Sequence, residues 1–152
     1  MNPSSILFVC LGNICRSPLA EGIAAHIVRA EGLDVRIDSA GTGSWHIGES
    51  PCPNSIRVAK QNGIDISTLR GRQVCREDFE RFEHIIALDD KNRRDLEALG
   101  CRKVRKLGEF GFGGEDVPDP YFFDGFEGFE KVYEMIATGV GNILSELKAG
   151  KL

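Results

Sequence analysis

A single stretch, Ser5-Ile-Leu-Phe-Val-Cys10-Leu-Gly-Asn-Ile-Cys-Arg-Ser-Pro18, predicts the centre of the fold. Its first six residues form an apolar run that is typical of a strand buried on both faces of a parallel sheet. A short polar loop follows, and Pro18 favours the first turn of a helix. The stretch therefore predicts a strand, a loop and a helix in direct succession.

Strands and helices alternate along the rest of the chain. Leu19, Ile23 and Ile27 recur at helical spacing, and Gly32 is the residue type that ends a helix. We predict further strands over 34–39, 84–88 and 103–107, and further helices over 53–62, about 90–98 and 126–147. This order indicates one doubly wound α/β domain over 1–152, in which ligands bind beyond the carboxyl ends of the strands.

Two segments depart from this regular pattern. The segment 108–124 carries four glycines and two prolines, and it is long for an ordinary connection, so we predict a functional loop there. The last helix has the clearest apolar periodicity of the chain, but Gly139 and Gly141 are expected to weaken it locally.

Composition narrows the classes of function. The 152 residues are 41% hydrophobic, which fits one compact core, and the net charge of −4 gives no electrostatic reason to expect nucleic acid as a partner. No apolar segment is long enough to cross a membrane, and the first residues lack the features of a secretory signal. Five cysteines are an odd number, so we predict reduced thiols and a cytoplasmic location.

The loop after the first strand has the residues of an anion site. Cys10 and Arg16 bracket it, and its backbone N–H groups, with those of the following helix, can converge on a tetrahedral dianion. Gly12 and Asn13 are residue types that tolerate the unusual backbone angles of such a loop. Arg16 can hold two phosphate oxygens at once, and Ser17 is a suitable N-cap for the helix.

The same positive field favours the thiolate form of Cys10, which would face a bound phosphate as a nucleophile. A cysteine at the end of a buried strand is more often a small core residue, and Ser17 before Pro18 occurs in many proteins. The combination of strand, cysteine, loop, arginine and helix favours the functional interpretation, with a phosphocysteine intermediate.

The loop Cys10-Leu-Gly-Asn-Ile-Cys-Arg-Ser-Pro18 resembles the phosphate-binding loop of the low-molecular-weight protein tyrosine phosphatases. The resemblance covers nearly the whole chain and continues in Asp38-Ser-Ala-Gly41, Gly63-Ile-Asp-Ile-Ser67, Arg72-Gln-Val74, Leu88-Asp-Asp-Lys-Asn92 and Asp119-Pro-Tyr121. It implies a four-stranded parallel sheet flanked by helices, and hydrolysis of phosphotyrosine without a metal or a cofactor. By the same likeness Cys10 is the nucleophile, Arg16 the phosphate clamp and Asp119 the general acid.

Asp119 is also an interesting residue without the resemblance. It stands between Pro118 and Pro120, which restrict the backbone and so could hold a catalytic acid in place. Turns often carry Asp and Pro, so this stretch alone does not identify a catalytic acid. Glu115 and Asp116 are nearby competitors without a proline on both sides.

The resemblance assigns further residues around the phosphate. Tyr121 and Phe122 would form one wall of a slot for the phenyl ring, and Trp45 another, although a solitary aromatic residue in a loop often only packs at an edge. A deep slot favours phosphotyrosine, because phosphoserine is too short to reach its base. The remaining members of the phosphate-binding loop are Leu11, Gly12, Asn13, Ile14, Cys15 and Ser17.

A supporting set of polar residues is implied in the same way. Asn13 and Ser39 would hold the loop, and Ser17 would donate its hydroxyl toward the Cys10 thiolate. Many members of the family have a histidine where this sequence has Thr68 and Leu69. Asp89 and Asn92 match a further family element, for which we expect a structural role.

Cys15 has two open interpretations. In the family, a second loop cysteine can form a disulfide with the nucleophile, and a resolving thiol beside an exposed thiolate is typical of a redox sensor. Cys15 could equally fill space behind the loop. The three histidines show no metal-ligand spacing with one another or with the cysteines, so no metal is predicted.

Three other functions compete with a tyrosine phosphatase. An arsenate reductase of this fold needs cysteines that relay a disulfide, whereas Cys75 and Cys101 are far apart and Cys52 sits between two prolines. An arginine phosphatase of this fold typically has Thr in the position of Ile14. A phosphopeptide-binding module would not need the acid. The expected partners are phosphotyrosine proteins, including tyrosine kinases, and oxyanions that inhibit; no membrane is expected.

Overall fold

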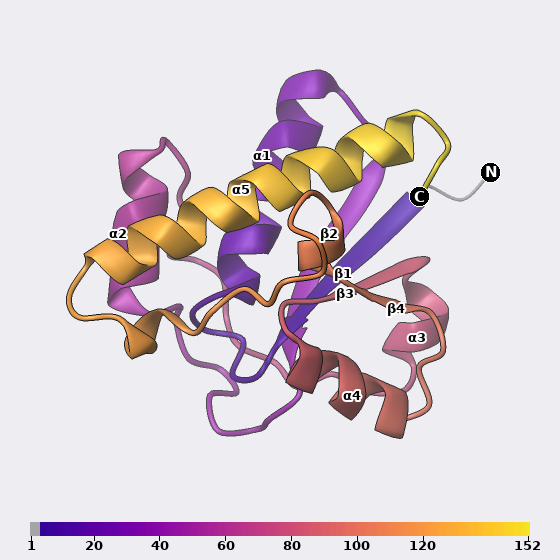
Figure 1. The fold of residues 1–152 in the computed structure, drawn as a ribbon, viewed down its shortest axis with the longest axis horizontal. Helices are drawn as coiled ribbons and strands as arrows, with labels where there is room; N and C mark the ends of the chain where they lie inside the picture. The colour runs from indigo at the N-terminus through magenta and orange to yellow at the C-terminus, as the bar shows by residue number, and fades with distance from the viewer. Residues whose placement is uncertain (1–3) are drawn as a thin grey trace.

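The computed structural model describes residues 4–152, except for the side chain of Phe122. Four parallel strands form one sheet in the order β2-β1-β3-β4 (Figure 1). Their bounds are β1 Ser4–Cys10, β2 Val35–Gly41, β3 His84–Ala87 and β4 Val104–Lys106. The predicted four-stranded parallel sheet is therefore confirmed.

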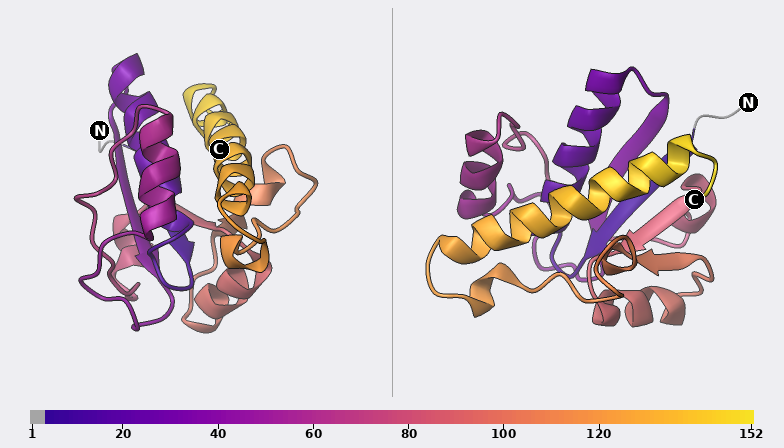
Figure 2. Two further views of the ribbon diagram at one scale, coloured as in Figure 1. Left: turned by 90° about the vertical axis from the view of Figure 1, so that its left-hand side faces the viewer. Right: turned by 45° about the horizontal axis from the view of Figure 1, so that its top comes forward.

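Helices cover both faces of this sheet. Their bounds are α1 Ser17–Glu31, α2 Pro53–Gln61, α3 Asp78–Arg81, α4 Asp90–Ala98 and α5 Glu127–Lys148, with short 3-10 helices η1 Leu107–Glu109 and η2 Pro120–Phe122. Helices α1, α2 and α5 lie on one side of the sheet, and α3 and α4 lie on the other (Figures 1 and 2). The sequence did not predict α3, η1 or η2, which are too short to show a period of their own.

Strand β1 is central because both of its faces are buried. Ile6 and Phe8 point into the core shared with α1 and α5, whereas Leu7 and Val9 point into the smaller core on the other face. All four side chains are completely buried, and each fully buried side chain of this size stabilises the fold by roughly 1.5–3 kcal/mol. The apolar run was therefore a sound indication of a central strand.

Helix α5 runs without a break through the two glycines that were expected to weaken it. Gly139 faces Leu107, and a Cβ atom at that position would lie only 2.4 Å from its Cδ2 atom. Gly141 has open space instead. The first glycine therefore allows a close approach between α5 and η1, and the packing stabilises the helix despite its lower propensity.

The outer edge of β2 is partly covered by the chain itself. Gly41 forms a parallel bridge with Gln73, and its N–H donates to the carbonyl of Arg72 over 2.8 Å. The N–H of Val74 donates to the carbonyl of Gly41 over 2.8 Å. This segment closes the sheet edge at the carboxyl end of β2, beside the loop that follows β1.

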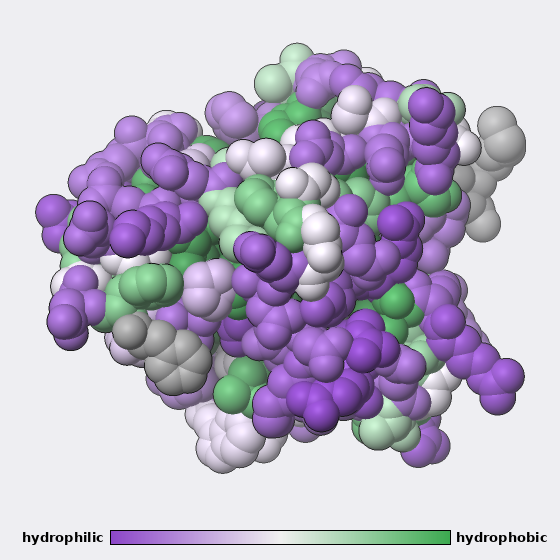
Figure 3. All heavy atoms as spheres, viewed as in Figure 1, coloured by the Kyte–Doolittle hydropathy of each residue, from purple (hydrophilic) through white to green (hydrophobic). Residues whose placement is uncertain are grey.

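The surface seen with α5 in front is mainly hydrophilic, and its hydrophobic residues lie in small separate groups (Figure 3). Over residues 4–152 we find no helix with the length and apolar character needed to cross a bilayer.

Candidate active site

The loop between Cys10 and Ser17 joins the carboxyl end of β1 to the start of α1. Asn13 has a φ of 58°, a left-handed conformation that asparagine tolerates better than most residues. Its side chain is buried and fully engaged: Oδ1 accepts from the N–H of Arg72 over 3.0 Å, and Nδ2 donates to Ser17 and Ser39 over 2.8 and 2.9 Å. Asn13 therefore fixes the shape of the loop from inside.

The backbone of the loop has free hydrogen-bond donors. Among the described residues, no acceptor is found for the N–H groups of Gly12 or of Ile14 through Ser17. These groups include the first N–H groups of α1, where the helix dipole contributes partial positive charge. The loop is thus able to bind an anion.

Cys10 lies at the base of this loop and is only 2% exposed. Its Sγ atom is 3.0 Å from Oγ of Ser17 and accepts from the N–H of Asn13 over 3.3 Å. Ser17 is the first residue of α1 and not its N-cap, a position held by Arg16, so the capping prediction is wrong. The hydroxyl of Ser17 bonds instead with Sγ of Cys10 and accepts from Nδ2 of Asn13.

Arg16 is buried and held from behind. Its Nη1 atom donates to Oδ2 of Asp89 over 2.7 Å and to the carbonyl of Val117 over 3.0 Å. Asp89 is the N-cap of α4, where its Oδ1 accepts from the N–H of Asn92 over 2.7 Å. Asp89 therefore has more than the structural role that was expected. It caps α4 and also orients the guanidinium of Arg16, which was predicted to bind phosphate.

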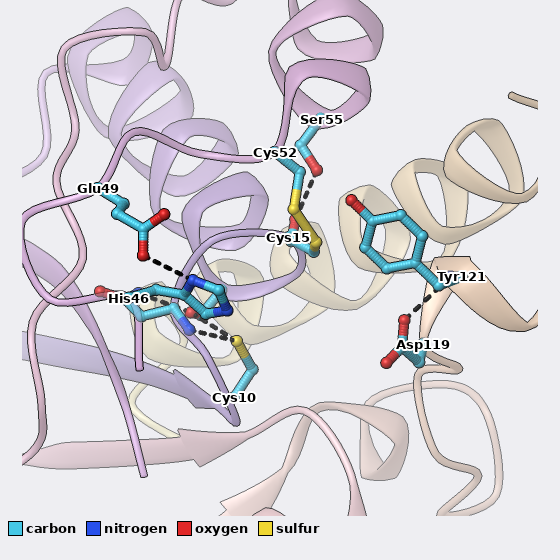
Figure 4. The surroundings of a disulfide bond; sticks show 10 residues. Cys10, Cys15, His46, Glu49, Cys52, Ser55, Asp119 and Tyr121 are labelled. Carbon is cyan, nitrogen blue, oxygen red and sulfur yellow. Dashed lines mark hydrogen bonds and ion pairs between the residues drawn. A yellow bond between two sulfur atoms is a disulfide. The ribbon is translucent and has the colours of Figure 1, made fainter. Parts of the chain in front are cut away.

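Asp119 belongs to the loop that precedes α5. Its carboxylate Oδ1 accepts from the N–H of Tyr121 over 2.9 Å and caps η2. Asp119 lines the same cavity as Cys10 and Arg16, and Figure 4 shows it on the far side of the cavity from Cys10. The structure therefore brings together the three residues that the sequence named as catalytic.

The cavity has a volume of about 150 Å³ and an aromatic rim. Trp45 and Tyr121 both line it and are 70% and 65% exposed, and Tyr121 packs edge-to-face on Phe129. The side chain of Phe122, which was predicted as a third wall, lies outside the described part of the chain. Leu11, Gly12, Ile14, Cys15 and His46 complete the lining.

His46 was not predicted as a site residue. Its ring lies close to Gly12, and its Nδ1 atom is 2.7 Å from Oε2 of Glu49 (Figure 4). It follows Trp45 directly, so the aromatic residue that was predicted as a wall could have drawn attention to its neighbour.

A hydrogen-bonded chain leads from Cys10 to Glu21. It passes through Ser17, Asn13 and Ser39, and the hydroxyl of Ser39 donates to Oε1 of Glu21 over 2.6 Å. Burial raises the pKa of Glu21 to about 7; the charge of nearby Asp38 acts in the same direction, and the bond from Ser39 opposes it.

Leu69, one of the two residues at the position where the resemblance implied a histidine, packs against the apolar core. The polar chain thus ends at Glu21, a residue that the sequence analysis missed. It lies four residues after Ser17 and so on the same face of α1, which is the signal that could have identified it.

Cys15 forms a disulfide with Cys52, across 37 residues of sequence. The prediction that all five cysteines are reduced is therefore wrong. A bond between Cys15 and Cys10 is not present in this state and stays an open interpretation for the oxidised protein. The free cysteines are Cys10, Cys75 and Cys101. The sequence analysis dismissed Cys52 because of its prolines, but Pro53 in fact opens α2 and brings Cys52 behind the loop.

Within residues 4–152, no group of three or more His, Cys, Asp or Glu side chains lies close enough together to hold a metal ion. The chemistry that the site offers is that of a thiol, an arginine, free N–H groups and a carboxyl group around one small cavity.

Comparisons with known proteins identify the family of the chain. The family model for low molecular weight phosphotyrosine protein phosphatase matches residues 5–151. The low molecular weight protein-tyrosine-phosphatase YfkJ of Bacillus subtilis is 37% identical over 97% of each chain, and its crystal structure superposes with a TM-score of 0.91 over 100% of this chain and 99% of that one.

Two further solved structures are similar. A protein tyrosine phosphatase of Entamoeba histolytica, with Hepes in its active site, has a TM-score of 0.91 at 34% identity over 98% and 99% of the two chains. The arginine phosphatase of Drosophila has a TM-score of 0.87 at 35% identity over 94% and 97%. The fold is that of a protein tyrosine phosphatase. The chain belongs to the low-molecular-weight phosphotyrosine protein phosphatase family.

Proposed function

We propose that this phosphatase hydrolyses phosphotyrosine through a phosphocysteine intermediate on Cys10. The thiolate attacks phosphorus, so that an S–P bond forms while the bond from phosphorus to the tyrosine oxygen breaks. Asp119 gives its proton to the departing oxygen. A water molecule then attacks the phosphocysteine, Asp119 takes up a proton, and phosphate and the Cys10 thiolate are released.

The observation that carries this proposal is the convergence of Cys10, Arg16 and Asp119 on one cavity. The phosphate oxygens would bind to the free N–H groups of the loop and to Arg16. Because Asp89 and Val117 both engage Nη1 of Arg16, its Nη2 and Nε atoms can take two oxygens in a planar pair of hydrogen bonds. Such preorganised donors stabilise the charge that develops on the transferring group.

The depth of the cavity favours tyrosine as the substrate residue. Cys10 is almost fully buried at its base, whereas Trp45 and Tyr121 are largely exposed at its rim. A phenyl ring between the two aromatic side chains would span this depth, and a serine side chain would not. The proposed partners are phosphotyrosine proteins, among them tyrosine kinases, and other tetrahedral oxyanions would compete for the loop. The cytoplasmic location stays a prediction.

The test is the variant Cys10→Ser, which is nearly isosteric but has a poor nucleophile at neutral pH. We expect it to lose turnover of a phosphotyrosine peptide and still to bind vanadate or phosphate, measured by calorimetry. The variant Cys75→Ser is the matched control, since Cys75 is exposed and does not line the cavity. Hydrolysis that persists in Cys10→Ser would overturn the proposed mechanism.

Two related reactions are measured in the same assay. Phosphoarginine is included because a similar structure is that of an arginine phosphatase, although Ile14 replaces the Thr typical of that branch. Arsenate with a dithiol is included because Cys52 is closer to the loop than the sequence suggested. A kcat/KM that is highest for either of these substrates would replace phosphotyrosine in the proposal.

A further inference from the structure

The disulfide between Cys15 and Cys52 connects the phosphate cavity to a protected thiol behind it. Cys15 lines the cavity together with Cys10, whereas Cys52 is 3% exposed and does not line it (Figure 4). An oxidant or a small thiol that enters the cavity can thus meet Cys10 and Cys15, but not Cys52.

Backbone contacts hold the two bonded cysteines together independently of their sulfur atoms. The N–H of Cys52 donates to the carbonyl of Ile14 over 2.7 Å, and the hydroxyl of Ser55 donates to the carbonyl of Cys15 over 2.9 Å. Because these bonds do not involve sulfur, they can persist when the disulfide is reduced. Cys52 is also the N-cap of α2, a position that favours the thiolate form.

We propose that Cys52 is a resolving thiol that returns Cys10 to its active form after oxidation by a peroxide. The proposal depends on the proposed function in one respect, namely that Cys10 is the nucleophile. In its reduced form, the protein would consume one equivalent of peroxide and end with Cys10 free and with Cys15 bonded to Cys52. That is the arrangement of cysteines that the structure holds.

The reaction proceeds in three balanced steps. A hydroperoxide transfers oxygen to the Cys10 thiolate, which gives a sulfenic acid and the corresponding alcohol or water. Cys15 attacks this sulfur, so that a Cys10–Cys15 disulfide forms and water leaves. The Cys52 thiolate then attacks Sγ of Cys15, which forms the Cys15–Cys52 disulfide and expels Cys10 as a thiolate.

The last step is favoured by the surroundings of both sulfur atoms. The expelled Cys10 thiolate is stabilised by the N–H of Asn13 and the hydroxyl of Ser17, and so is a good leaving group. A dithiol that enters the cavity can later attack Cys15 and break its bond to Cys52. The dithiol is oxidised to its own disulfide, and Cys15 and Cys52 are reduced to thiols.

The experiment starts from fully reduced protein, freed of reductant under anaerobic conditions and given one equivalent of hydrogen peroxide. Samples are alkylated at intervals, the cysteines are mapped by peptide mass, and phosphatase activity is followed without added thiol. We expect the activity to fall and then to recover, with Cys15–Cys52 as the final disulfide. In Cys52→Ser the oxidation should stop at the Cys10–Cys15 disulfide. Its phosphatase activity should then stay at about a tenth of the initial value or below until dithiothreitol is added.

Two controls keep the result interpretable. Cys75→Ser should behave like the unaltered protein, and reduced Cys52→Ser should have its full initial activity, which also shows that it is folded. Protein whose Cys15–Cys52 bond is already closed should lack the protection, so that one equivalent of peroxide leaves Cys10 as sulfenic acid and a second equivalent carries it on to sulfinic acid.

Three results would overturn the proposal: Cys10–Cys15 as the final disulfide of the unaltered protein, equal recovery with and without Cys52, or protection that does not depend on the state of the disulfide. If no reduced protein has phosphatase activity, the proposed function fails, but the map of disulfides still decides whether Cys52 resolves Cys10. If Cys52→Ser does not fold, the final disulfide of the unaltered protein decides alone.

Discussion

Asp119 faces Cys10 across the cavity from a segment that two prolines stiffen. If it protonates the departing oxygen, Asp119→Asn should lower kcat/KM on phosphotyrosine by roughly 10²–10⁴-fold, the usual contribution of general acid–base catalysis. The loss in the first step should shrink with an activated aryl phosphate, whose oxygen needs little protonation. The measurement is the slope of log rate against leaving-group pKa, from pre-steady-state bursts.

The matched control for this prediction is Asp116→Asn. The carboxylate of Asp116 is already engaged, since its Oδ1 accepts from the N–H of Asp90 over 2.9 Å and from Nζ of Lys106 over 2.8 Å. Its loss should leave the slope unchanged. A steeper slope in Asp116→Asn, with an unchanged slope in Asp119→Asn, would move the acid to Asp116.

Glu21 makes stability depend on pH. Its pKa is raised from 4.5 to about 7 in the folded state, so the folded protein holds this proton more tightly than the unfolded chain does. The resulting stability is fully present below pH 4.5 and is lost as the pH rises through 7. Its size is on the order of 3 kcal/mol, since one pKa unit corresponds to about 1.4 kcal/mol.

Glu21→Gln removes this titration and keeps an acceptor for the hydroxyl of Ser39. Compared with the unaltered protein, the variant should become relatively more stable as the pH rises from 4.5 to 8, in urea unfolding measured at several pH values. Two parallel profiles of unfolding free energy against pH would mean that Glu21 titrates normally. The control is Glu134→Gln, which changes an exposed carboxylate on α5.

Two of the residues that the sequence analysis missed share one property. Cys52 is bonded to the loop through α2, and Glu21 is linked to it through Ser39 of β2, only after distant parts of the chain have packed together. Cys10, Arg16 and Asn13, by contrast, lie within seven consecutive residues, so their spacing alone predicted an anion site. Residues that are close together in the sequence could thus be assigned to the site, whereas residues that tertiary packing brings to it could not.

At the scale of elements, α5 offers a comparison between two glycines in one helix. Gly139→Ala would drive a Cβ atom against the fully buried Leu107, so we expect a loss of roughly 1–3 kcal/mol of unfolding free energy. Gly141→Ala meets open space and should stabilise by up to about 1 kcal/mol, because alanine has the higher helix propensity. Urea denaturation of both variants measures the difference; equal effects would show that Gly139 is not needed for packing.

The longer elements were predictable, and their ends less so. The predicted strand over 34–39 in fact runs over Val35–Gly41, because its last residues pair with β1 up to the position opposite Cys10. Helix α1 ends at Gly32 as expected, with a φ of 65°. Its first residue is Ser17, which does not hold the N-cap position predicted for it, because its hydroxyl is bonded to Cys10 and does not cap the helix.

At the scale of the whole molecule, the disulfide closes a loop of 37 residues. Such a closure lowers the entropy of the unfolded chain and stabilises the fold by up to about 4 kcal/mol. Dithiothreitol should therefore lower the midpoint of urea unfolding for the unaltered protein and for Cys75→Ser. It should have no effect on Cys52→Ser, and an equal effect on that variant would assign the loss to another cause.

The architecture as a whole followed from the alternation of strands and helices and from the apolar run of β1. The expectation of a four-stranded parallel sheet came with the resemblance, and the order of the strands was not predicted, because contacts between strands leave no mark in a single sequence.

The pairing of Gly41 with residues 72–74 has a consequence for the behaviour of the protein at high concentration. An open strand edge is a template on which strands of other molecules can aggregate. Here the carboxyl end of that edge, at Gly41, is occupied by the chain itself, and the rest of the strand carries the charged residues Arg36 and Asp38. Charged side chains on an edge strand disfavour its pairing with a strand of another molecule, so this edge resists intermolecular β-pairing without any additional covering element.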